Sequence, residues 1–286
     1  MKKITGHLKK LKTVLNTTID YYLLLDDKEI LLNAFLGKLI SFYHIGIICC
    51  IQCGRKTNKS FQRGFCFPCL RRLQECNLCI IHPERCQIEK EKCPVDDWAH
   101  THCHQSHVVY LANSSGLKVG ITRETHIPTR WIDQGALQAV PIFYTANRYQ
   151  AGIIEVTLKA FISDRINWRR MLRNETKEVD LIAVRDALLQ EAHHSLKVVT
   201  GQFKSEDIHP VGTSIVTRLN YPVLQYPDKV KALSLDKVFL VHGRLLGIKG
   251  QYLILDSGVV NIQKYSGYVV ECLMEEQIAN NGCNDK

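Results

Sequence analysis

The sequence has no hydrophobic run long enough to cross a membrane. Its most apolar stretch, Leu39 to Cys53, contains His44 and is shorter than the ~20 residues that a spanning helix needs. Residues 1–12 return to lysine several times and never become the apolar core of an export signal. These absences predict a cytoplasmic protein with no membrane association.

Acidic residues are few relative to basic ones. The chain of 286 residues has 28 Asp and Glu against 37 Lys and Arg, which gives a formal net charge of +9. Such an excess favours a polyanionic partner, nucleic acid of either kind (DNA or RNA), although many basic proteins use it only for solubility. A hydrophobic content of 45% is ordinary for a folded protein of two or three modules. Nothing in the composition indicates the oligomeric state.

Cysteines are concentrated in one segment. Ten of the twelve fall between residues 49 and 103, and without export they should stay reduced and available to metal. Two Cys-x-x-Cys pairs, Cys50 with Cys53 and Cys66 with Cys69, are separated by 12 residues. Four thiolates at this spacing can surround one ion tetrahedrally, so the sequence predicts a structural zinc site.

The loop between the two pairs is basic and contains turn-forming residues. A positively charged loop that is held rigid by a metal can contact a phosphate backbone. We therefore expect nucleic-acid contacts from Arg55, Lys56 and Lys59.

More potential ligands follow than one zinc ion needs. They are Cys76, Cys79, Cys86, Cys93, Cys103 and His107. The sequence predicts one further zinc ion, held by Cys76 and Cys79 with two of the other four, and leaves a third ion open. The alternative is that some of these cysteines are free and behave as small hydrophobic residues. His100, His102 and His104 fit a solvated loop better than a ligand set.

A strand–turn–strand–helix pattern follows the cysteine segment. Residues 108–112 and 117–122 have strand character and flank a turn at 113–116, which predicts a β-hairpin. Apolar residues at helical spacing predict a helix over 151–162, and a second helix is expected over 179–198.

The two ends of the chain are rich in strand-forming residues. Strands over 238–241 and 251–255 are expected to form a hairpin around 247–250. Gly37 to Gly46 and Gly258 to Gly267 have the same spacing, which suggests similar strand pairs in a single sheet or barrel.

Short motifs in the central segment resemble the GIY-YIG nuclease superfamily. Val108-Val-Tyr110 and Lys118-Val-Gly-Ile-Thr122 are similar to its paired first strands, in the branch where Lys-Ile-Gly replaces Tyr-Ile-Gly. Arg130, Glu155 and Asn167 follow in the order of the family's arginine, metal-binding glutamate and terminal asparagine. The likeness covers about residues 107–170.

The resemblance implies hydrolysis of phosphodiester bonds with Mg²⁺ or Mn²⁺. It makes Glu155 the metal ligand, Arg130 the group that stabilises charge on the phosphate, and Tyr110 the residue that positions or activates water. Lys118 would replace the family's second tyrosine, and Asn167 would orient the site. The alternative for each residue alone is an ordinary structural role.

Two departures from the family pattern bear on catalysis. Two extra residues separate Gly120 from Arg130, so Arg123 competes for the arginine's role. Four residues after Arg130 the family has a histidine or tyrosine, whereas this chain has Gln134, which cannot act as a base.

Aromatic rings next to cations offer further nucleic-acid contacts, because such pairs can stack bases and bind phosphates. The expected contacts are Trp168, Arg169, Arg170 and the Arg123 already named. A buried tryptophan that anchors a small domain is the alternative.

Over its whole length the chain also resembles DUF2797, a family of bacterial zinc-binding proteins of unknown function. The sequence segments that carry this resemblance are residues 53–57, 114–123, 128–136, 167–169 and 247–252. This resemblance implies a shared architecture and no particular activity.

We therefore expect an α+β protein. Its parts are a β-rich region (1–49), a zinc-binding segment (50–107), a GIY-YIG-like domain with a following helix (108–200), a second β-rich region (201–276) and a flexible tail (277–286). The leading interpretation is a zinc-binding protein that engages nucleic acid and cuts it. The alternatives are a non-catalytic DNA-, RNA- or ribonucleoprotein-binding module and a zinc-knuckle protein–protein adaptor.

Overall fold

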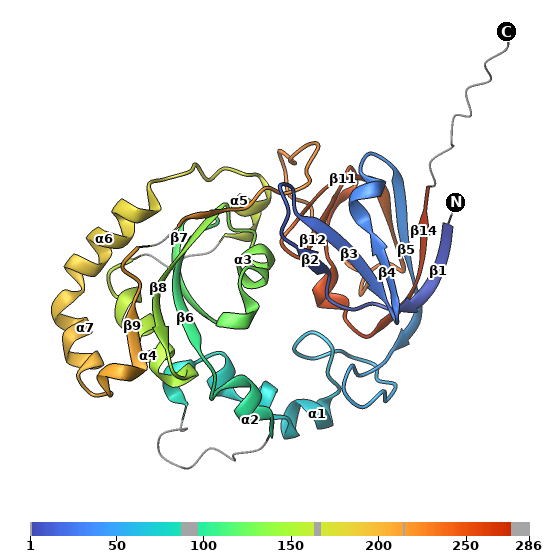
Figure 1. Ribbon diagram of the computed structural model, residues 1–286. Coiled ribbons are helices and arrows are strands. Elements are labelled where there is room, and N and C mark those ends of the chain that lie inside the picture. Colours follow the sequence, from blue (N-terminus) through green and yellow to red (C-terminus); the bar gives the residue numbers. More distant parts are fainter. Residues whose placement is uncertain (1, 87–96, 163–166, 214, 276–286) are drawn as a thin grey trace, which may run out of the picture.

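Strands from the two ends of the chain pair in the computed structural model, which describes residues 2–86, 97–162, 167–213 and 215–275 (Figure 1). β14 (Tyr268–Met274) lies between β1 (Lys2–His7) and β5 (Leu39–Ile48), antiparallel to both. The sheet continues from β5 through β11 (Leu240–Lys249), β12 (Tyr252–Leu255) and β13 (Gly258–Asn261). The two β-rich regions are thus separate along the chain but share one six-stranded sheet.

The two ends also repeat one local structure. β3 (Asp20–Leu25), β4 (Lys28–Leu31) and a 3₁₀ helix at Leu32–Phe35 precede β5, just as β12, β13 and a 3₁₀ helix at Ile262–Tyr265 precede β14. Gly37 and Gly267 follow the two 3₁₀ helices with φ angles of 78° and 86°. Gly37 therefore corresponds to Gly267 in this repeat. β2 (Lys12–Val14) joins β3 and β4 in a three-stranded sheet.

A third sheet carries the central segment. Its order is β10 (Thr217–Arg218), β8 (Gln138–Thr145), β6 (His107–Asn113) and β7 (Leu117–Arg123), and β9 (Ile208–Pro210) also pairs with β8. The hairpin predicted around residues 113–116 is confirmed as β6 and β7, with Tyr110 opposite Gly120.

β6 is buried on both faces, and its alternate residues contribute to different cores. Val108, Tyr110 and Ala112 pack in the core shared with the six-stranded sheet. Val109 and Leu111 face the other core, which the helices complete. β6 thereby joins the two halves of the molecule and fixes the direction of the Tyr110 side chain.

The helices α4 (Arg148–Lys159), α6 (Leu181–Glu191) and α7 (His193–Thr200) cover the outer face of the central sheet (Figure 1). α4 begins earlier than expected because the Asn147 side chain caps it by accepting from the Gln150 N–H (3.0 Å). The single helix expected over 179–198 is two helices that meet at Ala192.

Four shorter helices complete the fold: α1 (Phe67–Arg72), α2 (Asp97–His102), α3 (Thr129–Asp133) and α5 (Trp168–Leu172). α2 includes His100 and His102, so these residues lie on a helix and not in the expected loop. The turn of the β11–β12 hairpin lies at Gly250 and Gln251, because β11 runs on through Gly247. Among the described residues, no helix has the length and apolar character to span a membrane. The fold is α+β, as the sequence predicted.

Candidate functional site

The cysteines of the first two Cys-x-x-Cys pairs lie together. The Sγ atoms of Cys50, Cys53, Cys66 and Cys69 are all within 4.8 Å of one another, and those of Cys53 and Cys66 are 3.8 Å apart. Four thiolates bound at ~2.3 Å to one tetrahedral zinc ion would be about 3.8 Å apart, so this group fits one zinc ion. The predicted clustering of the four thiols is confirmed.

A tight turn and the start of a helix position these thiols. The Gly54 N–H donates to the Cys50 carbonyl oxygen (2.9 Å), and Cys66 directly precedes α1. Burial acts to raise the pKa of Cys50, but hydrogen bonds from the backbone N–H groups of Cys53 and Cys66 outweigh it and lower that pKa. N–H groups that stabilise a thiolate favour metal binding.

The remaining cysteines divide between two places. Cys76 packs against the four-cysteine cluster, whereas Cys79 packs with the buried Cys86 and Cys103. Cys93 lies outside the described residues. Within the described parts of the chain, no second group of three ligand atoms lies as close together as the first. A second zinc ion stays a prediction.

His107 is fully buried at the start of β6. Its Nδ1 atom lies 2.7 Å from the carbonyl oxygen of Gln105, which makes Nδ1 the donor. Burial and the nearby Arg148, opposed by the hydrogen bond to the Gln105 carbonyl, together lower the pKa of His107 to about 4. The ring is therefore neutral at pH 7.

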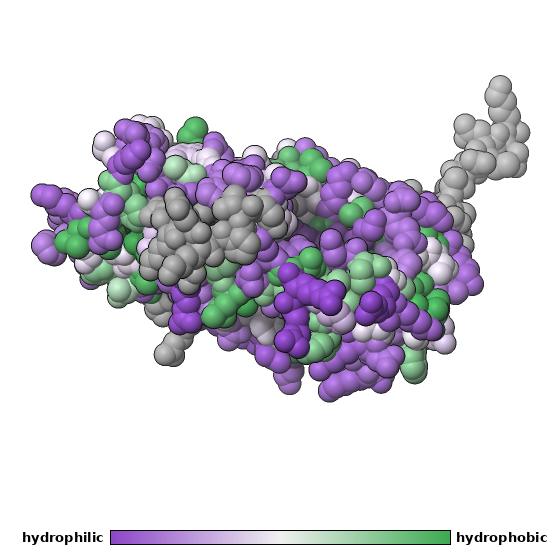
Figure 2. Space-filling model, turned by 90° about the horizontal axis from the view of Figure 1, so that it is seen from below, coloured by the Kyte–Doolittle hydropathy of each residue, from purple (hydrophilic) through white to green (hydrophobic). Residues whose placement is uncertain are grey.

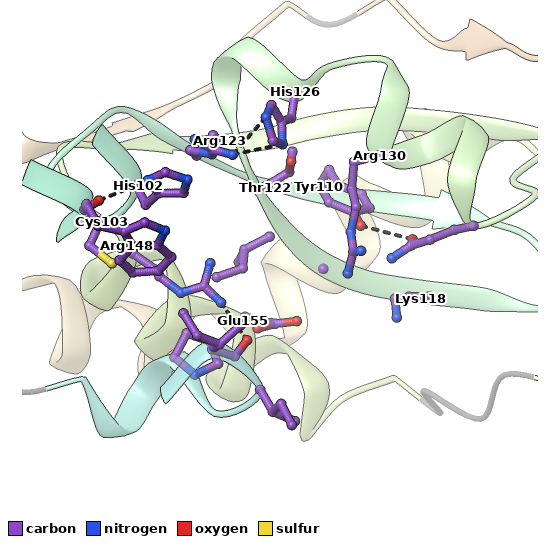
Figure 3. A pocket seen from close by; sticks show the side chains of 17 residues that line it. His102, Cys103, Tyr110, Lys118, Thr122, Arg123, His126, Arg130, Arg148 and Glu155 are labelled. Atoms are coloured by element: carbon purple, nitrogen blue, oxygen red, sulfur yellow. Dashed lines mark hydrogen bonds between the residues drawn. The ribbon is translucent and has the colours of Figure 1, made fainter. Parts of the chain in front are cut away.

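A cavity of about 310 Å³ brings together four of the five residues that the nuclease resemblance implies (Figure 3). Tyr110 and Lys118 reach it from β6 and β7, Arg130 from α3, and Glu155 from α4. Residues far apart in the chain thus line one space, with the arginine, the tyrosine and the carboxylate facing it.

Gln134 links the tyrosine to the arginine. Its carboxamide lies 3.0 Å from the Tyr110 hydroxyl, and in the orientation that satisfies both ends its oxygen accepts from Nε (3.1 Å) and Nη2 (3.2 Å) of Arg130. Burial raises the pKa of Tyr110, although Arg130 acts to lower it. Gln134, which stands where the nuclease superfamily has a histidine or tyrosine, therefore holds Tyr110 and Arg130 in place.

Glu155 is 7% exposed and is the one carboxylate among the residues that line the cavity. One of its oxygens lies 2.9 Å from Nζ of Lys159, one helical turn further along α4. A single carboxylate beside an open cavity suits Mg²⁺, which takes most of its ligands from water and phosphate. Lys159 competes with such a cation for the same oxygen.

Cations outnumber carboxylates around the cavity. Lys118, Arg123, Arg130 and Arg148 all line it. Burial, and then Arg148, lower the pKa of the Arg123 guanidinium, and burial followed by Arg123 lowers the pKa of His126. This concentration of positive charge favours an oxyanion such as phosphate.

The cysteine segment forms one wall of the cavity. Ile80, Ile81 and Pro83 line it, and Arg148 donates to the Ile80 carbonyl oxygen (2.7 Å). Gly152 of α4 lies so close to Pro83 that a Cβ atom at position 152 would be 2.7 Å away. The glycine thus allows the cysteine segment to lie directly against α4.

Asn167 and the residues after it lie elsewhere. The Asn167 side chain caps α5 by accepting from the N–H groups of Arg169 (3.1 Å) and Arg170 (3.2 Å). Trp168 stacks on Tyr252 with ring centroids 5.5 Å apart, and the Arg169 guanidinium lies 4.4 Å from the Trp168 ring centre. None of these residues lines the cavity, so the structure favours a packing role for Trp168.

Comparison with known proteins gives one match. The family described as "Protein of unknown function (DUF2797)" matches residues 37–270. The chain belongs to the DUF2797 family. No curated protein and no solved structure matches it. The matched residues include the four-cysteine cluster and every residue that lines the cavity.

The polar residues that line the cavity of this DUF2797 chain without having been predicted as site residues include His102, His126 and Arg148. Arg148 is the first residue of a helix, a position with no motif of its own. His126 is 2.8 Å from Nη2 of Arg123, and His102 stacks on Trp98 at 4.3 Å. Only the fold brings these side chains beside the tyrosine and the glutamate.

Proposed function

We propose that this zinc-binding DUF2797 protein engages nucleic acid, and that the cavity around Tyr110, Arg130 and Glu155 hydrolyses phosphodiester bonds. The observation that supports this proposal is the convergence of these residues, with Lys118, on one cavity rich in cations. The motif order did not predict that Arg148 would also line the cavity.

The cationic residues suit a phosphodiester. Arg130 is fixed by Gln134 with its guanidinium facing the cavity, so it can hold a phosphate oxygen and stabilise the charge that develops there. Arg123 and Arg148 stand across the cavity and can bind neighbouring phosphates. Tyr110 keeps its proton at neutral pH because burial raises its pKa, so its role is to orient a water molecule rather than to deprotonate it.

Glu155 is the residue that would hold Mg²⁺ or Mn²⁺. When bound, such a cation supplies charge neutralisation at the phosphate. Glu155 faces the cavity from α4, a rigid helix, and its partial burial strengthens its interaction with any cation that displaces Lys159.

A second candidate function is binding without cutting. The Glu155–Lys159 ion pair at 2.9 Å favours it, because a carboxylate that is already neutralised has less affinity for a metal ion. The same cavity would then hold a phosphate of DNA, RNA or a ribonucleoprotein as a docking contact.

Cleavage assays separate the two functions. Zinc-loaded protein is incubated with labelled single- and double-stranded DNA and RNA, with and without Mg²⁺ or Mn²⁺. Hydrolysis predicts metal-dependent cutting that falls at least about a hundredfold in Glu155→Gln and Arg130→Ala.

The matched controls are Glu178→Gln and Arg218→Ala, which disrupt an exposed ion pair that does not line the cavity. These controls should cut like the parent protein. If the parent protein binds nucleic acid without cutting it and Arg130→Ala loses this binding, the second function is established. If Glu155→Gln still cuts, the cavity is not the catalytic site.

A further inference from the structure

A second basic cavity, of about 700 Å³, lies between the six-stranded sheet and the loop that joins Cys53 to Cys66. Lys56, Lys59 and Arg63 line it from the loop, and His44, Phe239 and Tyr268 line it from the sheet. We refer to this cavity as the loop–sheet groove. It shares no lining residue with the cavity around Tyr110.

The sheet side of the groove is a series of aromatic rings. Phe239 is 62% exposed, and its ring is stacked on that of His44 with centroids 6.1 Å apart and an interplanar angle of 26°. The His44 ring is 4.8 Å from that of Tyr268. The backbone N–H of His44 also donates to the Phe239 carbonyl oxygen (2.7 Å), which holds the backbone of Phe239 against β5.

The floor of the groove is held by hydrogen bonds. Asp236 accepts from the Tyr268 hydroxyl and from Nζ of Lys264, each at 2.7 Å. Among the described residues, Asp236 is the only acidic one that lines the groove, and its charge is matched by Lys264. Lys56, Lys59 and Arg63 therefore give the groove a net positive charge.

The loop side has an unusual backbone. Gln62 and Arg63 have φ angles of 41° and 69°, a left-handed conformation that non-glycine residues seldom adopt. Flanking hydrogen bonds between Phe61 and Phe65 hold the turn, and Nη1 of Arg63 donates to Gln263 (3.0 Å). Strained backbone of this kind is concentrated at binding sites, and here it belongs to a turn whose Arg63 lines the groove.

We propose that the loop–sheet groove binds single-stranded nucleic acid, with a base stacked on Phe239 and the backbone phosphates on Lys56, Lys59 and Arg63. An exposed ring beside cations matches the alternating flat bases and anionic phosphates of a single strand. A duplex keeps its bases stacked internally and offers nothing to the ring. The inference rests on the proposed interaction with nucleic acid and names the form that this surface selects.

The test uses the full-length, zinc-loaded protein with Glu155→Gln, so that no probe is cut. It is titrated into fluorescein-labelled oligothymidylate of about 15 nucleotides, a matching duplex, and oligothymidylate with unlabelled heparin as competitor. Phe239→Ala should weaken single-strand binding about tenfold or more, whereas Phe239→Tyr, which keeps the ring, should stay within about twofold.

Two further comparisons define the surface. Phe67→Ala removes another exposed ring (52% exposed), which lies on α1 outside the groove, and should leave affinity within about twofold. Lys56→Gln and Lys59→Gln should each lower the slope of log affinity against log salt by about 0.7.

The proposal is overturned if Phe239→Ala binds like its parent, if Phe67→Ala has the larger effect, or if the duplex binds as tightly as the single strand. If single-strand binding depends on Phe239 and the wild-type protein cuts nothing, the groove proposal stands and the proposal of a hydrolytic cavity fails. If the wild-type protein cuts and Phe239→Ala does not change single-strand binding, the hydrolytic proposal stands and the groove proposal fails.

Discussion

The hydroxyl of Tyr110 lies against the backbone of Gly120, its partner across the β6–β7 pair. A Cβ atom at position 120 would be 2.7 Å from the hydroxyl oxygen and 2.8 Å from the ring carbon that bears it. The glycine of the Lys-Val-Gly motif is therefore required because the Tyr110 ring leaves no room for a side chain at position 120.

Gly120→Ala should displace the Tyr110 ring from the cavity. Overpacking of this kind costs about 1–3 kcal/mol of unfolding free energy, and we expect nucleic-acid cleavage to fall at least about tenfold. Urea denaturation and cleavage rates measure the two effects. Gly212→Ala is the matched control, because no atom lies within 4 Å of a Cβ built there. An unchanged rate in Gly120→Ala would mean that the ring position does not matter for the chemistry.

Zinc at the four-cysteine cluster should stabilise the surrounding loops. Cys53→Ser or Cys66→Ser removes one thiolate of four, so we expect loss of bound zinc, a lower Tm and rapid proteolysis within residues 50–86. Cys49→Ser is the matched control, since Cys49 is adjacent to Cys50 but outside the cluster. Zinc content by elemental analysis and a thermal melt provide the measurement. A Cys66→Ser protein that keeps both zinc and Tm would show that the four thiols do not hold the metal.

The sequence predicted the cysteine cluster and the β6–β7 hairpin, because both follow from local spacing. Cys50, Cys53, Cys66 and Cys69 need only two turns and a loop to meet, and the alternating strand pattern fixed the hairpin that carries Tyr110. Arg130 and Glu155, which the nuclease resemblance implies as site residues, line one cavity with Tyr110, and their catalytic roles stay predictions.

The pairing of strands that are far apart in the chain could not be predicted from the sequence. The sheet that joins β1 to β14 depends on strands more than two hundred residues apart, and no local pattern specifies such a register. The loop–sheet groove is a product of that pairing, so Phe239 and Tyr268 had no signal of their own. Asn167 lies outside the cavity because its side chain caps α5, a local role that the motif order did not predict.

Stability should decrease as the pH falls from about 6.5 to about 4, partly because of His107. Burial holds its folded pKa at about 4, below the value of ~6.5 expected in the unfolded chain. The unfolded state binds more protons between these values, so acid favours unfolding, with a full effect on the order of 3 kcal/mol. Urea denaturation at pH 7 and pH 5 should give a smaller difference for His107→Gln than for the wild type. Equal differences would show that His107 titrates alike in both states.

If a divalent cation binds in the cavity, we expect the Glu155–Lys159 ion pair to control its access. Nζ of Lys159 lies 2.9 Å from a Glu155 oxygen that Mg²⁺ would need, so the ammonium and the metal ion compete. Lys159→Met keeps the apolar stem of the side chain and removes its charge. If the cavity is hydrolytic, the Mg²⁺ concentration for half-maximal cutting should fall several-fold, on the order of the factor of ten that ~1.4 kcal/mol represents. Lys177→Met, a change of the same charge outside the cavity, controls for the general loss of a cation. An unchanged Mg²⁺ dependence in Lys159→Met would mean that Glu155 does not bind the metal, and would leave the cavity with a phosphate-binding role alone.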